Sequence, residues 1–211
     1  MRRRLVFPAL ALGVGLAAPA FAQIQATELG QREYFRQIPP DEQEIDVQVF
    51  GGAGTAVGGI SNNLGLGSIW SATAGTRITE GVGLEGGYVG SRLPFQDDRV
   101  PDGSALWRHG ADVMAKMYVP NPTVLRPFGG LGVGVSYMNP SDQAEPLYQT
   151  DWVTEIPIAA GVEVESQAVF AGARLQYEWL FGEEFAANAT PGESPGGGFL
   201  TGMLSVGGRF Q

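Results

Sequence analysis

The chain contains no cysteine and a single histidine, His109, among its 211 residues. The lack of cysteine excludes disulfides, cysteine-ligated zinc, iron–sulfur clusters and thiol catalysis, and one histidine cannot supply a multi-histidine metal site. Basic residues are also few, since 13 Lys and Arg stand against 22 Asp and Glu for a formal net charge of -9. This acidic balance argues against nucleic acid as a partner. Glycine is abundant instead, with 32 residues and no collagen period, so we expect it to serve a regular structure.

Residues 1–22 have the organisation of an export signal. A basic start, Met1 to Arg4, precedes an uncharged apolar run over residues 5–19. The small-x-small pattern that follows predicts cleavage between Ala22 and Gln23. The rest of the sequence has no uncharged apolar run near the length of a spanning helix. An exported protein of this kind is either soluble outside the inner membrane or a transmembrane barrel.

Beyond a polar leader over residues 23–44, apolar residues alternate with small or charged ones, which is the period-2 signature of β-strands. The clearest case is the segment 127–138, where Leu131, Val133 and Val135 alternate with glycines. The length of each segment is near the ~9–11 residues with which a tilted strand crosses a bilayer. We predict eight strands, over residues 45–54, 65–75, 81–91, 108–119, 127–138, 152–164, 167–180 and 199–210.

Connections between these strands alternate in length. Three are short, at residues 76–80, 120–126 and 165–166. Four are longer, at residues 55–64, 92–107, 139–151 and 181–198. Short turns on one side and long loops on the other are typical of membrane barrels. The pattern predicts an all-β protein, with residues 45–211 forming an eight-stranded antiparallel up-and-down transmembrane β-barrel.

The two faces of the strands predict which side meets lipid. Rows of glycine suit the interior of a narrow barrel, and a charged side chain that faces lipid near the midplane costs several kcal/mol. We therefore expect the apolar faces to point outward and aromatic residues near the strand ends to form interfacial girdles. The predicted girdle residues are Tyr88, Tyr137, Trp152, Trp179, Phe181, Phe199 and Phe210. The predicted lumen charge network consists of Asp46, Glu85, Asp112, Lys116, Glu155, Arg174, Glu178 and Arg209.

Three stretches, at residues 126–137, 171–178 and 204–210, resemble the OmpA-type family of small outer-membrane β-barrels. The resemblance covers residues 45–211. It implies contact with outer-membrane lipid and lipopolysaccharide, and it implies that Phe210, here followed by Gln211, is the terminal aromatic presented to the barrel-assembly machinery. The chain ends with the last predicted strand, so we expect no peptidoglycan-binding domain and carry over no cell-wall anchoring role.

Other candidate chemistry is weak. Residues 81–86, GVGLEG, match the dinucleotide fingerprint in letters, but no helix follows to receive a pyrophosphate. His109 has no serine two positions further along the strand, as a lipid-deacylating barrel of this kind would need. The acidic residues of the expected outer loops do not have the spacing of a calcium loop. They are Asp97, Asp98, Asp102, Asp142, Glu145, Asp151, Glu183, Glu184 and Glu193. We therefore expect no catalytic residue, metal or cofactor.

Three functions remain open on sequence grounds. The leading prediction is a non-enzymatic outer-membrane barrel with a structural or membrane-integrity role, its lumen filled by small and paired charged residues. One alternative is a small porin-like conduit for small solutes, in which the lumen ion pairs rearrange. The other is a soluble periplasmic, lipocalin-like barrel that binds a ligand in an apolar interior. The sequence identifies no external ligand.

Overall fold

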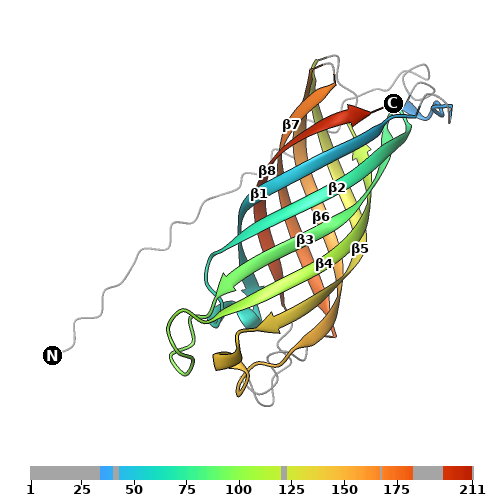
Figure 1. Ribbon diagram of the computed structural model, residues 1–211. Helices are drawn as coiled ribbons and strands as arrows, with labels where there is room; N and C mark the ends of the chain where they lie inside the picture. The colour runs from blue at the N-terminus through green and yellow to red at the C-terminus, as the bar shows by residue number, and fades with distance from the viewer. Residues whose placement is uncertain (1–33, 40–42, 120–122, 167, 183–196, 211) are drawn as a thin grey trace, which may run out of the picture.

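A computed structural model describes residues 34–39, 43–119, 123–166, 168–182 and 197–210. Eight antiparallel strands follow one another in chain order and close into a barrel, with β1 paired to both β2 and β8 (Figure 1). The predicted export signal and its cleavage site lie outside the described residues. The strands are β1 (Ile45–Gly58), β2 (Gly67–Thr79), β3 (Val82–Pro94), β4 (Ala105–Tyr118), β5 (Leu125–Pro140), β6 (Asp151–Ser166), β7 (Val169–Phe181) and β8 (Gly197–Phe210).

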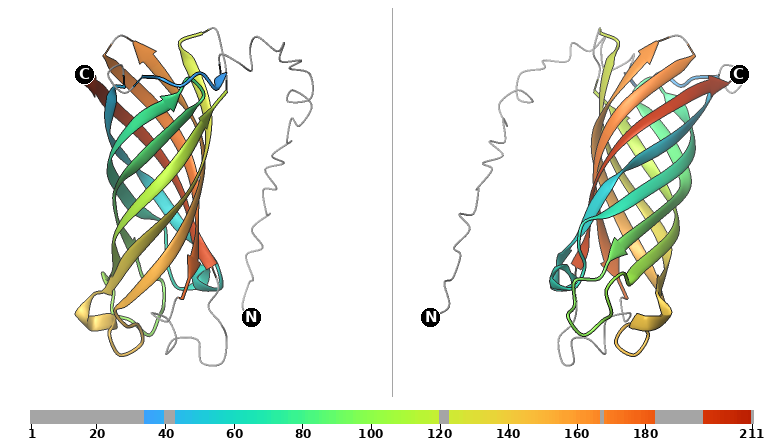
Figure 2. Two further views of the ribbon diagram at one scale, coloured as in Figure 1. Left: turned by 90° about the vertical axis from the view of Figure 1, so that its right-hand side faces the viewer. Right: turned by 60° about the vertical axis from the view of Figure 1, so that its left-hand side comes forward.

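The predicted fold class is confirmed, and the strands run somewhat further than the alternation of residues alone indicates. Residues 56–58, for example, pair with residues 197–199 although the alternation there is weak. The strand ends that short connections join, those between β2 and β3, β4 and β5, and β6 and β7, gather at one end of the barrel, the turn end (Figure 2). The other strand ends, which longer connections join, lie at the opposite, loop end, and two of these connections contain the short helices η2 (Gly59–Asn62) and η3 (Asp142–Ala144). No helix in the described part of the chain is long and apolar enough to cross a membrane.

The outer surface of the barrel is apolar. Leu131 is 59% exposed and Val133 64%, while Gly132 between them faces the interior. The predicted orientation of the two faces is therefore confirmed on β5, and the same alternation recurs on the other strands. Trp152, Trp179 and Phe181 point outward near the loop end, as predicted for the girdle. Trp70 and Trp107, which were not predicted there, join the outward aromatic residues.

Part of the leader crosses the turn end. Residues 34–39, the blue segment in Figure 1, lie beside the β2–β3 turn, where Gln37 forms an isolated β-bridge with Thr79. The backbone N–H of Gly81 donates to the carbonyl oxygen of Tyr34 at 3.1 Å. The Tyr34 ring covers Gly81 so closely that a Cβ added there would lie 2.1 Å from a ring carbon. This stretch of the leader is therefore held against the barrel wall.

The interior of the loop end is filled by an apolar cluster, here called the loop-end core. Residues of the long connections, among them Ile60 and Tyr148, pack onto inward side chains of the strands. Phe199 belongs to this core and is 1% exposed, so its prediction as a membrane-facing aromatic was wrong. Its position has the same odd parity as the inward Thr201 and Met203. The buried members of the loop-end core are Ala56, Ile60, Leu64, Leu93, Val100, Leu106, Met138, Ala144, Tyr148, Val153, Leu180 and Phe199.

Candidate functional site

The barrel interior between the loop-end core and the turn end is lined by charged side chains that meet across the lumen. Glycines on β5 make room for the long inward side chains of β4. A Cβ added at Gly130 would lie 2.5 Å from the sulfur of Met114, and one at Gly134 would lie 2.9 Å from Cβ of Asp112. The small residues of one strand and the long residues of its neighbour therefore fill the narrow interior together.

A middle cluster joins side chains from five strands. The Lys116 ammonium lies 2.5 Å from Oε1 of Glu163 and 3.2 Å from Oε2 of Glu85. Arg174 donates through Nη2 to both oxygens of Glu85, at 2.7 and 2.9 Å. The amide of Gln48 donates to Glu163 at 3.2 Å. Two cations and two carboxylates thus balance within the cluster, as buried charges require.

A second cluster lies beside the loop-end core. Arg108 pairs with Glu178 and, at 2.5 Å, with Glu155, and all three side chains are at most 2% exposed. The guanidinium also donates through Nε to the Ser136 hydroxyl at 3.0 Å, and Gln176 donates to Glu178 at 2.9 Å. One cation therefore serves two buried carboxylates, so the pairing depends on Arg108 alone.

A third cluster closes the turn end of the lumen. Arg209 lies 2.8 Å from Asp46 and 2.9 Å from Glu44, and it also pairs with Glu165. Three cations face three carboxylates here, and their side chains are more accessible than those of the two inner clusters. The members are Glu44, Asp46, Arg77, Arg126, Glu165 and Arg209.

Aromatic rings fill the space between the charged groups. The Phe128 ring lies 4.3 Å from the Lys116 ammonium, and the Phe50 ring lies 4.3 Å from the Arg174 guanidinium. Both distances are within the range of a cation–π interaction. The rings place apolar surface against one side of each cation, and this strengthens the electrostatic attraction within the ion pairs.

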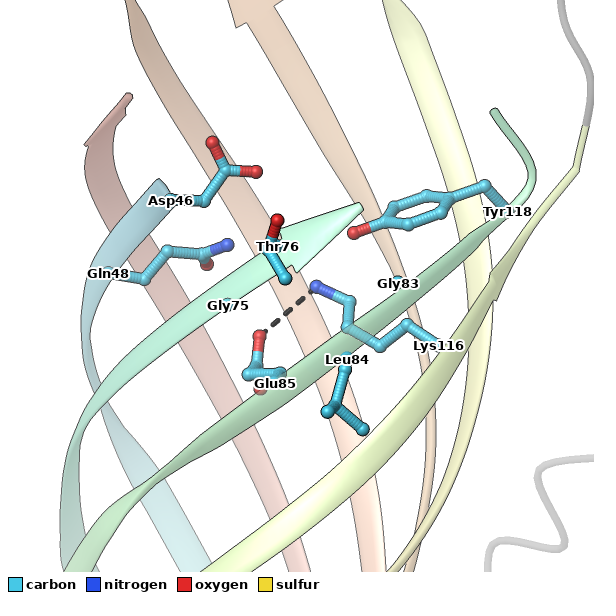
Figure 3. A pocket seen from close by; sticks show the side chains of 9 residues that line it. All are labelled: Asp46, Gln48, Gly75, Thr76, Gly83, Leu84, Glu85, Lys116 and Tyr118. Carbon is cyan, nitrogen blue, oxygen red and sulfur yellow. Dashed lines mark hydrogen bonds and ion pairs between the residues drawn. The ribbon is translucent and has the colours of Figure 1, made fainter. Parts of the chain in front are cut away.

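A small cavity separates the middle cluster from the turn end (Figure 3). Its volume is about 10 Å³, which is close to the space that one water molecule occupies. Gln48 and Thr76 line it, and Oε1 of the first and Oγ1 of the second are buried without a hydrogen-bond partner in the described protein. Figure 3 shows the Lys116 side chain reaching across the same space toward Glu85. The cavity therefore suits a water-sized polar guest and is too small for an organic ligand.

Seven of the eight residues proposed as a lumen network take part in these ion pairs. The eighth, Asp112, faces the interior, but no cation of the described residues lies within 4 Å of its carboxylate. Sequence reasoning missed Arg108, although it shares the inward parity of Asp112 and Lys116, and it missed Glu163 despite placing that residue on an inward face. The four others missed are just beyond the predicted strand ends: Glu44, Arg77, Arg126 and Glu165.

The remaining motifs do not form a second site. His109 lies on the outer face of β4, where its Nδ1 is 2.7 Å from the Tyr88 hydroxyl. Residues 81–86 lie in the β2–β3 turn and on β3. Asp97 accepts hydrogen bonds from Arg99 and from the Tyr148 hydroxyl, which joins the β3–β4 and β5–β6 connections. A group of acidic or histidine residues suited to hold a metal ion does not occur among the residues that the structure describes.

Three solved structures have the same architecture. Neisserial surface protein A is 15% identical, with 78% of this chain and 95% of that protein covered and a TM-score of 0.54. For Ail, the attachment invasion locus protein of Yersinia pestis, the identity is 14%, the covered shares are 79% and 98%, and the TM-score is 0.51. The outer membrane protein OprG from Pseudomonas aeruginosa is 9% identical, with 80% of this chain and 96% of that protein covered and a TM-score of 0.51. These likenesses show that the chain has the fold of a small eight-stranded β-barrel. No family model matches the chain, and no curated protein matches it by sequence.

Proposed function

We propose that this protein is an integral outer-membrane β-barrel with a structural, non-enzymatic role in the membrane. The observation that carries the proposal is the distribution of its side chains, with apolar residues exposed outside and charged residues buried inside. Leu204 is 70% exposed, whereas Glu155 is 1% exposed. In water, such an apolar outer face would far exceed the patches that soluble proteins expose, whereas a bilayer requires it. A lipocalin-like, ligand-binding barrel would need the reverse distribution.

Closure of the lumen supports a structural role over transport. Eight strands leave an interior that side chains fill, and three ion-pair clusters occupy this one. Beyond them, the loop-end core places twelve buried apolar residues across the outer end of the same interior. A solute entering from the turn end would have to separate buried ion pairs and then displace this core.

The test of the proposal begins with the location of the protein. Expressed with its own export signal, the protein should fractionate with the outer membrane and migrate differently on a gel before and after boiling. A closed, detergent-resistant barrel produces this heat-dependent shift because it stays folded in the unboiled sample. Recovery from the soluble periplasm without a shift would contradict the proposal.

A porin-like conduit is the second candidate, and the small cavity beside Lys116 favours it. Polar atoms of Gln48 and Thr76 face space that water can fill. If the neighbouring ion pairs rearranged, this space would extend into a hydrated path through the lumen. We expect no steady single-molecule conductance in planar bilayers, for the wild type or for the exposed control Arg36→Glu. Steady conductance that changes in Arg174→Glu would favour the conduit instead.

We propose that the outward Phe210 serves as the assembly signal and that the barrel-assembly machinery is its partner. Phe210 is 60% exposed, ends β8 and pairs with Ile45, so its ring lies at the seam that closes the barrel. Phe210→Ser should lower the amount of protein in the outer membrane several-fold, whereas Phe35→Ser should not. Equal amounts of the two variants in the outer membrane would contradict the role of Phe210 as the assembly signal.

A further inference from the structure

One cation on the strands does not face the lumen. Of the seven Lys and Arg residues on described strands, six take part in the lumen ion pairs. The seventh, Arg92 on β3, lies between the inward residues Ser91 and Leu93 and therefore points outward. No carboxylate in the described ranges lies within 4 Å of its guanidinium. An arginine at this end of the wall is at the depth of the membrane interface, where its charge costs little, and it is free to bind a partner from outside the protein.

Arg92 lies within a group of outward aromatic residues near the loop end. Its guanidinium carbon is 5.8 Å from the centre of the Trp107 ring, which is 6.3 Å from that of Trp70. The Trp70 indole lies across Gly90, where an added Cβ would be 2.4 Å from the ring. Gly90 pairs with Trp70 on β2 and with His109 on β4. The His109 ring in turn contacts the Tyr88 hydroxyl. We call Trp70, Tyr88, Arg92, Trp107 and His109 the Arg92 patch.

The Arg92 guanidinium retains most of its hydrogen-bonding capacity. Within the described structure, Arg92 donates one hydrogen bond, from Nη2 to the carbonyl oxygen of Gly103 at 3.3 Å. A guanidinium has five N–H donors in a planar fork, which matches two oxygens of a phosphate. The bond to Gly103 orients the side chain toward the loop end, where the headgroups of the outer leaflet would lie. Aromatic belts mark that depth of the membrane.

The surface on the membrane side of the Arg92 patch is shallow. The next outward residues toward the turn end are Ala72 and Ala74 on β2, Gly86 on β3 and Ala111 on β4. Their small side chains leave space along the wall below Tyr88 and His109, which are the members of the Arg92 patch nearest the turn end. A phospholipid is complementary to this surface, because its anionic phosphate would meet the guanidinium and its apolar acyl chain would lie over the small residues.

We propose that the Arg92 patch binds the phosphate of an outer-leaflet lipid, whose acyl chain lies over the small residues below. Arg92 holds the phosphate, and the indoles of Trp70 and Trp107 flank the headgroup. This inference rests on the proposed membrane orientation. It adds a specific site to a wall that would otherwise contact lipids without preference.

Quenching of tryptophan fluorescence by brominated lipids tests the site. The chain has four tryptophans, so Trp152→Phe with Trp179→Phe leaves the two reporters in the Arg92 patch. The complementary variant, Trp70→Phe with Trp107→Phe, leaves two outward reporters away from it. Both would be placed in phosphatidylcholine vesicles that contain either brominated phosphatidic acid or brominated phosphatidylcholine. One cation near a membrane surface is worth about fivefold in binding an anionic lipid.

We expect about fivefold preferential quenching by phosphatidic acid at the patch reporters only. Arg92→Gln should abolish the preference and Arg92→Lys should retain it. Equal quenching by the two lipids, persistence of the preference in Arg92→Gln, or its loss on addition of inorganic phosphate would overturn the lipid site. A failure of the proposed membrane orientation gives a different result, in which neither lipid quenches any of the four tryptophans, and it would overturn both proposals.

Discussion

Arg108 on β4 and Glu178 on β7 form an ion pair inside the barrel although 70 residues separate them in the chain. Both side chains are 1% exposed, and the same guanidinium also holds Glu155. The three residues therefore act as one unit, in which a single cation pairs with two carboxylates next to the loop-end core. Removal of Arg108 would therefore leave both carboxylates without their cation.

Replacing Arg108 with Met should reduce the free energy of unfolding by about 3–5 kcal/mol, because two buried carboxylates lose their counter-charge. The matched control is Arg36→Met, whose partner Glu80 is 3.2 Å away but whose own side chain is 72% exposed. That change should cost about 1 kcal/mol or less. Urea unfolding of the protein in lipid vesicles measures both. Similar losses for the two variants would show that the buried pairing is not what stabilises this region.

An arginine on the outer wall distinguishes a membrane protein from a soluble one. Val133→Arg, at a site 64% exposed in the middle of β5, should cost about 2–4 kcal/mol in a bilayer. Val124→Arg, 65% exposed in the β4–β5 turn, should cost about 1 kcal/mol or less, since it lies at the membrane edge. Unfolding in vesicles gives both values. A soluble barrel would tolerate the two substitutions equally.

Two glycines of β8 provide a matched test of interior packing. A Cβ at Gly207 would lie 2.4 Å from the carbonyl oxygen of Val47 and 2.7 Å from the Phe170 ring, whereas nothing lies within 4 Å of one at Gly202. Gly207→Ala should therefore destabilise the barrel by about 1–3 kcal/mol, and Gly202→Ala should be near neutral. The same unfolding measurement applies, and a reversed order would mean that the interior is loosely packed.

Hydrogen bonds from Arg99 hold the pKa of the Asp97 carboxyl below its ordinary value. A lowered pKa in the folded state means that the ionised carboxylate stabilises the loops above pH ~3.9, and that this contribution disappears as the pH falls through the folded-state pKa. In an NMR titration, the Nε–H signal of Arg99 should respond with a midpoint below ~3.9. Asp97→Asn should remove the response. A midpoint at or above that value would show that the contact is absent in solution.

Burial and the hydrogen bond to Asp97 raise the pKa of the Tyr148 hydroxyl. A raised pKa means that the neutral phenol stabilises the loop contact fully below pH ~10, and that this contribution is lost as the pH rises through the folded-state pKa. Tyrosine ionisation followed by absorbance should lose its highest-pH component in Tyr148→Phe. If the lost component instead titrates near pH 10, Tyr148 is accessible to solvent.

The fold was predictable because a strand with one face toward lipid and one toward a packed interior must alternate at every residue. Val133 and Gly134 show that alternation directly in the sequence. The lumen clusters were predictable only in part, since Arg77 and Glu165 lie where alternation fades but pairing continues. The loop-end core was not predictable. Ile60 and Tyr148 are in irregular connections, and their burial depends on contacts between distant segments that no periodic pattern records.

Pairing of Ile45 with Phe210 and of Asp46 with Arg209 places the start of β1 beside the end of β8 at the turn end. Every strand then has a neighbour on each side, and the order of strands around the wall is cyclic. A connection of two residues, as between the end of β6 at Ser166 and the start of β7 at Val169, is long enough to join these two ends. We therefore expect a circularly permuted chain, joined at these ends and opened within a long connection, to build the same wall with its new ends at the loop end.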